Sequence, residues 1–374
     1  MNLKLAPVPE VLTYRTSAQR PDESDVIRRR AAAGELTRVA RGLYAESSGW
    51  AALRPTEQHH LRLRSFADRI RPGDLISHVS AAVVFGVPLL TPPPTRIHVT
   101  SRGADRRTTN ATFVVHADLD AERNERPVAT PDGLLLCGLD RLATDLALTL
   151  PFTDAVVSLD ALLRREVERE DVLSAIERRG QKGRRRALRA IGFADAASDS
   201  PGESYARARF DQFGTPRPVL QHRFRVLGEP HIVVDFWFPD AGVVVEFDGA
   251  VKYRSSAYLR GRTPEEALFD EKIREDRLRA FPEVRTVVRL TWSDLRNEWV
   301  LRAKLRKAGV RMSRRGPSVT HRARLFGILP VRTVRGSSPT ADLAARCGVV
   351  GSERGRAPCI VRRSGASSPL RAGL

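Results

Sequence analysis

The segment 231–249 constrains the fold most, because it places three carboxylates in two otherwise apolar runs. Between the two runs, residues 239–242 read Pro-Asp-Ala-Gly, a composition typical of a tight turn, and this predicts a β-hairpin. Counting outward from the turn in antiparallel register sets Asp235 opposite Glu246, with Cβ atoms roughly 5 Å apart. Two like charges would then face each other across the hairpin.

Strict alternation along both strands predicts one apolar face that packs into a core. The residues expected on this face are Val234, Phe236, Phe238, Val243, Val245 and Phe247. The opposite face carries Asp235, Glu246 and Asp248, and three ionised carboxylates at short range call for a cation. Ligands that are all oxygen suit Mg²⁺ or Mn²⁺. The alternative is a solvated sheet face whose acids point at water.

A helix precedes the hairpin, and a helix and a strand follow it. Ser200 and Pro201 are expected to begin the first helix, with Glu203 completing a capping box, which is by itself a sufficient structural reason for that glutamate. A strand near 220–226 comes next, and beyond the hairpin lie a helix over 263–280 and a strand over 284–290. The predicted order is therefore αβββαβ.

This order, with its Asp-x(10)-Glu-x-Asp-Gly motif, resembles the PD-(D/E)XK nuclease superfamily, and most of all small uncharacterised members related to the very-short-patch repair endonuclease. The resemblance covers residues 198–308. It implies a restriction-endonuclease-like domain in which Asp235 and Glu246 hold Mg²⁺ and Glu203 joins them. It also implies phosphodiester hydrolysis, with Asp248 holding a second ion or a water.

Two positions depart from the family pattern. The slot of the usual lysine, one residue after the second acid, holds Asp248, and Lys252 stands where close relatives have histidine. Lys252 is a candidate to supply the missing positive charge, but an inactive site fits the same residues. Arg274 and Arg277, on the following helix, are candidate phosphate contacts, against the alternative of an exposed face laced with acids.

The sequence of the N-terminal region 1–50 predicts a helix over 24–33, followed by a basic hairpin around Arg41-Gly42. This arrangement is typical of the last helix and wing of a winged helix-turn-helix. The segment 36–44 reads Leu-Thr-Arg-Val-Ala-Arg-Gly-Leu-Tyr and resembles the wing of AbiEi-type antitoxin domains. The resemblance implies DNA binding, with Arg38 and Arg41 as contacts, and a toxin partner.

Residues 51–130 are expected to form an α+β extension of this antitoxin-like region. A capped helix is predicted over 55–71, with His59 and His60 on its surface. Strands around 96–100 and 112–116 flank a polar turn. His98 and His116, one on each strand, are candidates to pair, although ordinary core or edge histidines are the commoner case.

A helical connector is predicted over 131–197, with a break near Pro151. Its aspartates have the spacing of polar-face residues; they are Asp140, Asp145, Asp154 and Asp160. A basic cluster around Arg184, Arg185 and Arg186 joins two of its helices. The cluster is either a phosphate-binding patch or a solvated linker.

The formal charge of +19 favours a polyanionic partner. Twelve arginines and only two acids fall within 313–374, so residues 309–374 are expected to be a disordered basic tail, either a polyanion-binding arm or a read-through extension. Three scattered cysteines and the lack of a long apolar run indicate a cytoplasmic protein. We therefore expect a mixed α/β (α+β) protein that binds DNA, with RNA as an alternative substrate and no membrane partner.

Overall fold

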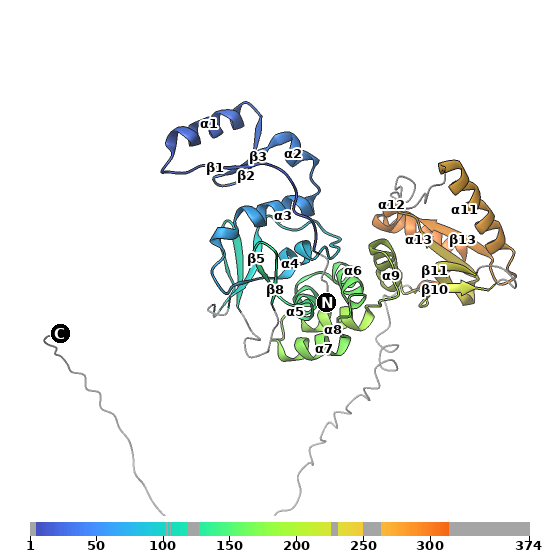
Figure 1. The fold of residues 1–374 in the computed structure, drawn as a ribbon. Helices are drawn as coiled ribbons and strands as arrows, with labels where there is room; N and C mark the ends of the chain where they lie inside the picture. Colours follow the sequence, from blue (N-terminus) through green and yellow to red (C-terminus); the bar gives the residue numbers. More distant parts are fainter. Residues whose placement is uncertain are drawn as a thin grey trace, which may run out of the picture. The chain divides into compact units, whose positions relative to one another are not determined.

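The computed structural model describes residues 5–101, 104, 106–117, 127–225, 231–249 and 263–313. Helices and strands alternate along these ranges, so the chain is a mixed α/β protein (Figure 1). Lys252 and nearly all of the basic tail, from residue 314 onward, lie outside the described residues.

The N-terminal unit is a helix beside a small antiparallel sheet. Its elements are β1 (Thr13–Arg15), α1 (Pro21–Ala32), β2 (Leu36–Ala40), β3 (Leu43–Glu46) and α2 (Ser47–Ala52). The strand order β1-β3-β2 contains the predicted hairpin, whose turn uses Gly42 at a φ of 75°. Helix α1 begins at Pro21, three residues before the predicted start, because proline suits the first helical position and acids occupy the first turn.

The middle of the chain begins with a six-stranded sheet and its covering helices. These are α3 (Pro55–Ser65), β4 (Leu75–Ile76), α4 (His78–Val84), β5 (Ile97–Ser101), β6 (Thr108–Thr109), β7 (Phe113–Ala117), β8 (Val128–Ala129) and β9 (Leu135–Leu136). The strand order is β6-β7-β5-β4-β9-β8. The prediction of strands around a turn was wrong in one respect: β5 and β7 pair in parallel, and β6 lies between them in sequence, antiparallel to β7.

Four helices follow: α5 (Leu139–Thr149), α6 (Phe152–Leu163), α7 (Arg169–Arg178) and α8 (Arg184–Phe193). The break at Pro151 is as predicted. One continuous core joins these helices to the sheet, and the boundary we predicted at residue 130 falls between paired strands β8 and β9. The predicted polar face was wrong for Asp145, Asp154 and Asp160, which are all buried.

The C-terminal part has the predicted αβββαβ order. It comprises α9 (Pro201–Phe213), β10 (Val219–Phe224), β11 (Ile232–Phe238), β12 (Val243–Phe247), α11 (Pro264–Arg279), β13 (Thr286–Leu290), α12 (Trp292–Arg296) and α13 (Glu298–Ala308). The sheet order is β10-β11-β12-β13, with β13 parallel to β12. Helix α9 lies close to β12, since a Cβ on Gly202 would fall 2.0 Å from the ring of Phe247.

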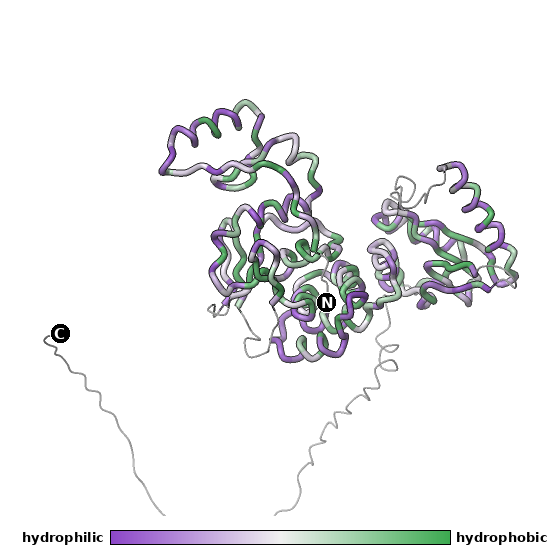
Figure 2. The backbone as a smooth tube through the Cα atoms, in the orientation of Figure 1, coloured by the Kyte–Doolittle hydropathy of each residue, from purple (hydrophilic) through white to green (hydrophobic). Residues whose placement is uncertain are grey.

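Both faces of this sheet are apolar, which the alternation argument did not foresee. Phe236, Phe238 and Val245 pack into one cluster with α9 and α13, as expected. A second cluster contains Val234, Trp237 and Val244, which pack against residues that include Leu278 of α11. The hydropathy colouring shows the apolar strands of this sheet (Figure 2). Asp235 lies in the middle of β11, between residues that pair with β10, and Glu246 lies one residue before the end of β12.

Candidate functional site

The hairpin has the predicted register, and its two acids lie just beyond the last residue pair between β11 and β12. These strands pair through Phe236 and Val245. One residue further, the Asp235 carboxylate accepts a hydrogen bond of 2.7 Å from the backbone N–H of Phe247. The side chain of Asp235, in the middle of β11, thus links this strand to β12 beside Glu246.

Glu246 is held by an arginine from the next helix. Arg274 of α11 donates to Glu246 Oε1 at 2.6 Å and to the carbonyl of Val233 at 2.6 Å. Burial opposes the charge of this guanidinium, but its hydrogen bond to Glu246 raises the pKa of Arg274. The Glu246 side chain is only 12% exposed, so the arginine compensates a carboxylate with little access to water.

Asp248 also lies near an arginine. Arg289 of β13 approaches the Asp248 carboxylate at 3.9 Å and donates to Glu271 at 2.5 Å and to Glu275 at 3.0 Å. These acids raise the pKa of Arg289 despite its partial burial. Two arginines and a group of acids therefore form one network at this end of the sheet.

Glu203 has a different environment. Its Oε1 accepts from the Ser200 hydroxyl at 2.7 Å, and its Oε2 accepts from Asp199 N–H and from Gln221, each at 3.0 Å. The Ser200 hydroxyl in turn accepts from Glu203 N–H at 3.2 Å. Ser200 is the N-cap as predicted, but the capping box is not complete, because the Glu203 carboxylate accepts from the N–H of Asp199 and not from that of Ser200. These hydrogen bonds already engage both carboxylate oxygens.

Mg²⁺ at Asp235 and Glu246 remains a prediction. Carboxylate oxygens on two neighbouring strands are suitable donors, but Arg274 would have to leave Glu246 to make room. Within the described residues, three His, Cys, Asp or Glu ligand atoms come within 4.8 Å of one another at His78, His98 and His116, and at no acidic group. Arg277, on α11, is half-buried.

The other predicted nucleic-acid contacts lie on accessible parts of the chain. Arg38 and Arg41 are exposed on the hairpin of the N-terminal sheet. In the basic cluster, Arg185 and Arg186 are exposed at the start of α8, while Arg184 is half-buried. Arg186 also donates to the carbonyl of Leu148 at 2.8 Å. Their predicted role in phosphate binding stays a prediction.

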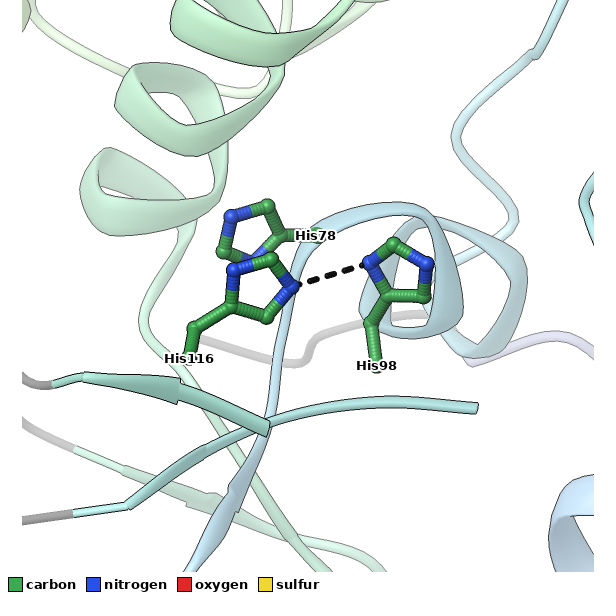
Figure 3. Close-up of side chains that lie close together, drawn as sticks. All are labelled: His78, His98 and His116. Carbon is green, nitrogen blue, oxygen red and sulfur yellow. Dashed lines mark hydrogen bonds between the residues drawn. The ribbon is translucent and has the colours of Figure 1, made fainter. Parts of the chain in front are cut away.

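The histidine group was missed by the sequence reasoning except for the pairing of His98 with His116. His98 Nδ1 and His116 Nε2 lie 3.1 Å apart, and the ring of His78 stacks on that of His116 with centroids 3.6 Å apart (Figure 3). The parallel register of β5 and β7 pairs His116 with Thr100, two residues from His98, so both imidazoles share one sheet face. His78 comes from the start of α4.

Burial keeps these rings neutral. It lowers the pKa of His98 to about 4, with His116 adding to the effect, and lowers the pKa of His116 to about 3, with His78 adding to it. The pKa of His78 also lies well below its usual value, again mainly because of burial. All three imidazoles therefore carry an available nitrogen lone pair at neutral pH.

A buried carboxylate lies behind the group. Asp145 of α5 is 3.4 Å from His78 Nδ1 and accepts from Arg179 at 3.0 Å, and Arg141 lies 3.8 Å away. Burial raises the pKa of Asp145, while the two arginines oppose that rise. The two arginines thus contact this carboxyl group in the core beside the histidines.

His59 and His60 are buried, so the prediction of a surface position was wrong. His59 Nδ1 contacts the carbonyl of Pro94 at 2.8 Å, and its Nε2 contacts Ser80 Oγ at 2.9 Å. The same hydroxyl accepts from the backbone N–H of His98 at 2.8 Å. His59 therefore helps to fix the strand that carries one of the clustered histidines.

No protein-family profile matches this chain. Two uncharacterized proteins of Mycobacterium tuberculosis, MT2308 of strain CDC 1551 and Rv2248 of strain H37Rv, are each 32% identical to it over 124 residues, or 32% of this chain. The matched part spans about half of each relative (46%). The crystal structure of the Rv2827c protein from the same species matches over 50% of this chain and 68% of its own chain, at 20% identity and with a TM-score of 0.29.

Within the described residues, no helix is long and apolar enough to cross a membrane.

Proposed function

We propose that this chain is a DNA-binding protein whose C-terminal part hydrolyses phosphodiester bonds with a divalent metal, in DNA repair or defence. The observation that supports this most is the placement of Asp235 and Glu246 side by side on neighbouring strands of an αβββαβ unit, with Arg274 in contact with one of them. The proposal places the protein in the cytoplasm and leaves RNA as an alternative substrate.

In this proposal Asp235 and Glu246 hold Mg²⁺ or Mn²⁺. The ion would polarise the phosphate and lower the pKa of a bound water. Arg274 is the residue that balances Glu246 until metal arrives, and it then becomes available to a phosphate oxygen. Arg289, between Asp248 and the acids of α11, orients this end of the sheet.

Binding to DNA is assigned to exposed arginines that are separate from the carboxylates. Arg38 and Arg41 would contact the duplex from the N-terminal hairpin, and Arg185 and Arg186 would add phosphate contacts. Contacts of this kind are independent of base sequence and weaken steeply with salt.

The second candidate is a noncatalytic DNA-binding regulator of antitoxin type, with a toxin partner. The hydrogen bonds that engage Glu203 and the ion pair between Arg274 and Glu246 favour it, because they stabilise the acids without any metal. In this case the nuclease-like unit is a scaffold, and DNA binding persists in EDTA.

Cleavage of supercoiled plasmid, single-stranded DNA and single-stranded RNA in Mg²⁺ or Mn²⁺ separates the two candidates. Wild type is compared with Asp235→Ala and Glu246→Ala, and with Asp240→Ala, which removes an exposed acid from the turn of the same hairpin. We expect each site variant to lose about 10³-fold in rate, since one metal ligand contributes several kcal/mol. Equal cleavage by wild type and Asp235→Ala, or none by wild type in either metal, rules out the nuclease.

A further inference from the structure

His78, His98 and His116 converge from a helix and two strands, and each offers a ring nitrogen within 4.8 Å of the other two (Figure 3). We propose that these three histidines bind one transition-metal ion of the zinc type, at a site separate from the carboxylates of the C-terminal sheet. Imidazole nitrogen suits zinc and its neighbours in the first transition series far better than it suits Mg²⁺. The proposal is thus independent of the metal assigned to Asp235 and Glu246.

Two of the three donor atoms already have a suitable separation. Zinc–nitrogen bonds of about 2.0–2.1 Å at the tetrahedral angle place two ligand nitrogens roughly 3.3 Å apart. His98 Nδ1 and His116 Nε2 are 3.1 Å apart, close to that value. A shift of His78 along its stacking contact with His116 brings in the third donor. The hydrogen bond between His98 and His116 is replaced when both nitrogens bind the ion.

His78 is oriented as metal-binding histidines usually are. Its Nδ1 lies 3.4 Å from the carboxylate of Asp145 and 3.0 Å from Ser77 Oγ, which leaves Nε2 as the ligand atom. A hydrogen bond at one ring nitrogen fixes the tautomer of a ligating imidazole, and here its partner is Ser77 Oγ, while the nearer Asp145 oxygen makes no hydrogen bond to any described residue. Asp145 is itself held by Arg179 at 3.0 Å.

The backbone at His78 is unusual. His78 has a φ of 53°, in the left-handed region, directly at the start of α4. Such a conformation in a residue with a side chain is retained where the surrounding structure determines it, often at binding sites. The neighbouring hydroxyls are ordered too, since Thr100 Oγ1 donates to Ser77 Oγ at 2.8 Å.

Arginines lie near the proposed site. Arg141 and Arg179 lie beside Asp145, and Arg107 is close enough to affect His78, His98 and His116 electrostatically. Three protein ligands leave a fourth position for water or another small ligand, on the side where His98 and His116 are only half-buried.

The test uses the full chain, stripped with EDTA and dialysed, and titrated with Zn²⁺ by calorimetry and with Co²⁺ by visible absorption. We expect one ion per chain and a tetrahedral Co²⁺ spectrum. His98→Ala and His116→Ala should each lower the affinity for Zn²⁺ at least tenfold, because even the loss of a residue that only hydrogen-bonds a metal ligand costs about that much. His231→Ala removes an exposed histidine near β11 and should bind as wild type does. No binding by wild type, or equal binding by His98→Ala, overturns the proposal.

Two further variants keep the test informative. His116→Gln retains a polar side chain, so a correctly folded protein by circular dichroism that has lost the Co²⁺ spectrum supports a ligand role, and an unchanged spectrum overturns it. Asp235→Ala, which removes the predicted Mg²⁺ ligand, should bind one Zn²⁺ with unaltered affinity. Loss of zinc in that variant would refute a separate site, whatever the outcome of the cleavage assays.

Discussion

The carboxylates of the C-terminal sheet and the histidines of the middle sheet differ in how their charge is treated by the surrounding protein. Glu246 and Asp248 lie beside arginines, at 2.6 Å and 3.9 Å. His98 and His116 instead lose their charge, because burial lowers the pKa of each. A metal must displace an arginine at the first site, but it meets neutral donors at the second. The two groups should therefore differ in their response to substitution, acid and metal.

The largest effect should come from the one carboxylate of the histidine group. Asp145→Ala removes a buried carboxylate that Arg179 and Arg141 both contact, and we expect the free energy of unfolding to fall by about 3–5 kcal/mol. Urea denaturation measures this change. Glu177→Ala, an exposed acid on α7, should cost less than about 0.5 kcal/mol. A small effect of Asp145→Ala would show that the contacts of Asp145 with Arg179 and Arg141 contribute little to the free energy of unfolding.

Acid should destabilise the middle of the chain before the C-terminal sheet. Burial lowers the pKa of His59 and of His60 to about 4, so the folded state keeps them neutral while the unfolded state takes up protons below pH 6.5. The contribution of these histidines to the free energy of unfolding is fully present above pH 6.5 and is lost as the pH falls toward 4, by up to about 3 kcal/mol for each histidine. His59→Gln should reduce this slope.

The C-terminal sheet has a different pH window. Hydrogen bonds from Arg279 and Arg289, opposed by burial, lower the pKa of Glu275, so its contribution is complete above pH 4.5 and is lost as the pH falls further. Amide hydrogen exchange read separately on α4 and β12 resolves the two windows. Simultaneous loss of protection in both elements near pH 5.5 would contradict the separation.

These two groups also differ in how far they were predictable from the sequence. Asp235 and Glu246 are linked by one tight turn, so counting along two strands was enough to place them. His98 and His116 required the parallel pairing of β5 and β7, which depends on long-range packing rather than on local alternation. His78 and Asp145 come from separate helices, and nothing in their local sequence indicates that they meet.

Covering helices limited the prediction in the same way. Alternation predicted a charged face beside Asp235 and Glu246, yet Trp237 and Val244 pack there with Leu278 of α11 in an apolar cluster. His59 and His60 looked like surface residues because a polar helix pattern surrounds them, and only the packing against Ser80 and Pro94 buries the first. Local pattern gave the elements and their order, whereas tertiary contacts decided which faces are buried.

Removal of Arg274 tests whether Glu246 serves only as the partner of Arg274 in an ion pair or can also bind a metal ion. Arg274→Ala leaves Glu246 without its charged hydrogen bond, and we expect a loss of about 2 kcal/mol in unfolding free energy. Mg²⁺ should restore part of this loss, and restore less when Glu246→Gln is added. Lys272→Ala, exposed on the same helix, should change neither quantity. If Mg²⁺ has no effect on Arg274→Ala, Glu246 does not hold metal.

The smallest effect should be at Glu203, whose two predicted roles give different results. As a helix cap it accepts from Ser200, Asp199 and Gln221, so Glu203→Gln should lower stability by about 1 kcal/mol, as should Ser200→Ala. Both variants should then keep the Mg²⁺ response of wild type, because the cap acts on α9 and leaves Asp235 and Glu246 unchanged. Thermal melts with and without Mg²⁺ measure both quantities. Loss of the Mg²⁺ response at unchanged stability, in Glu203→Gln but not in Ser200→Ala, would instead make Glu203 a third metal ligand.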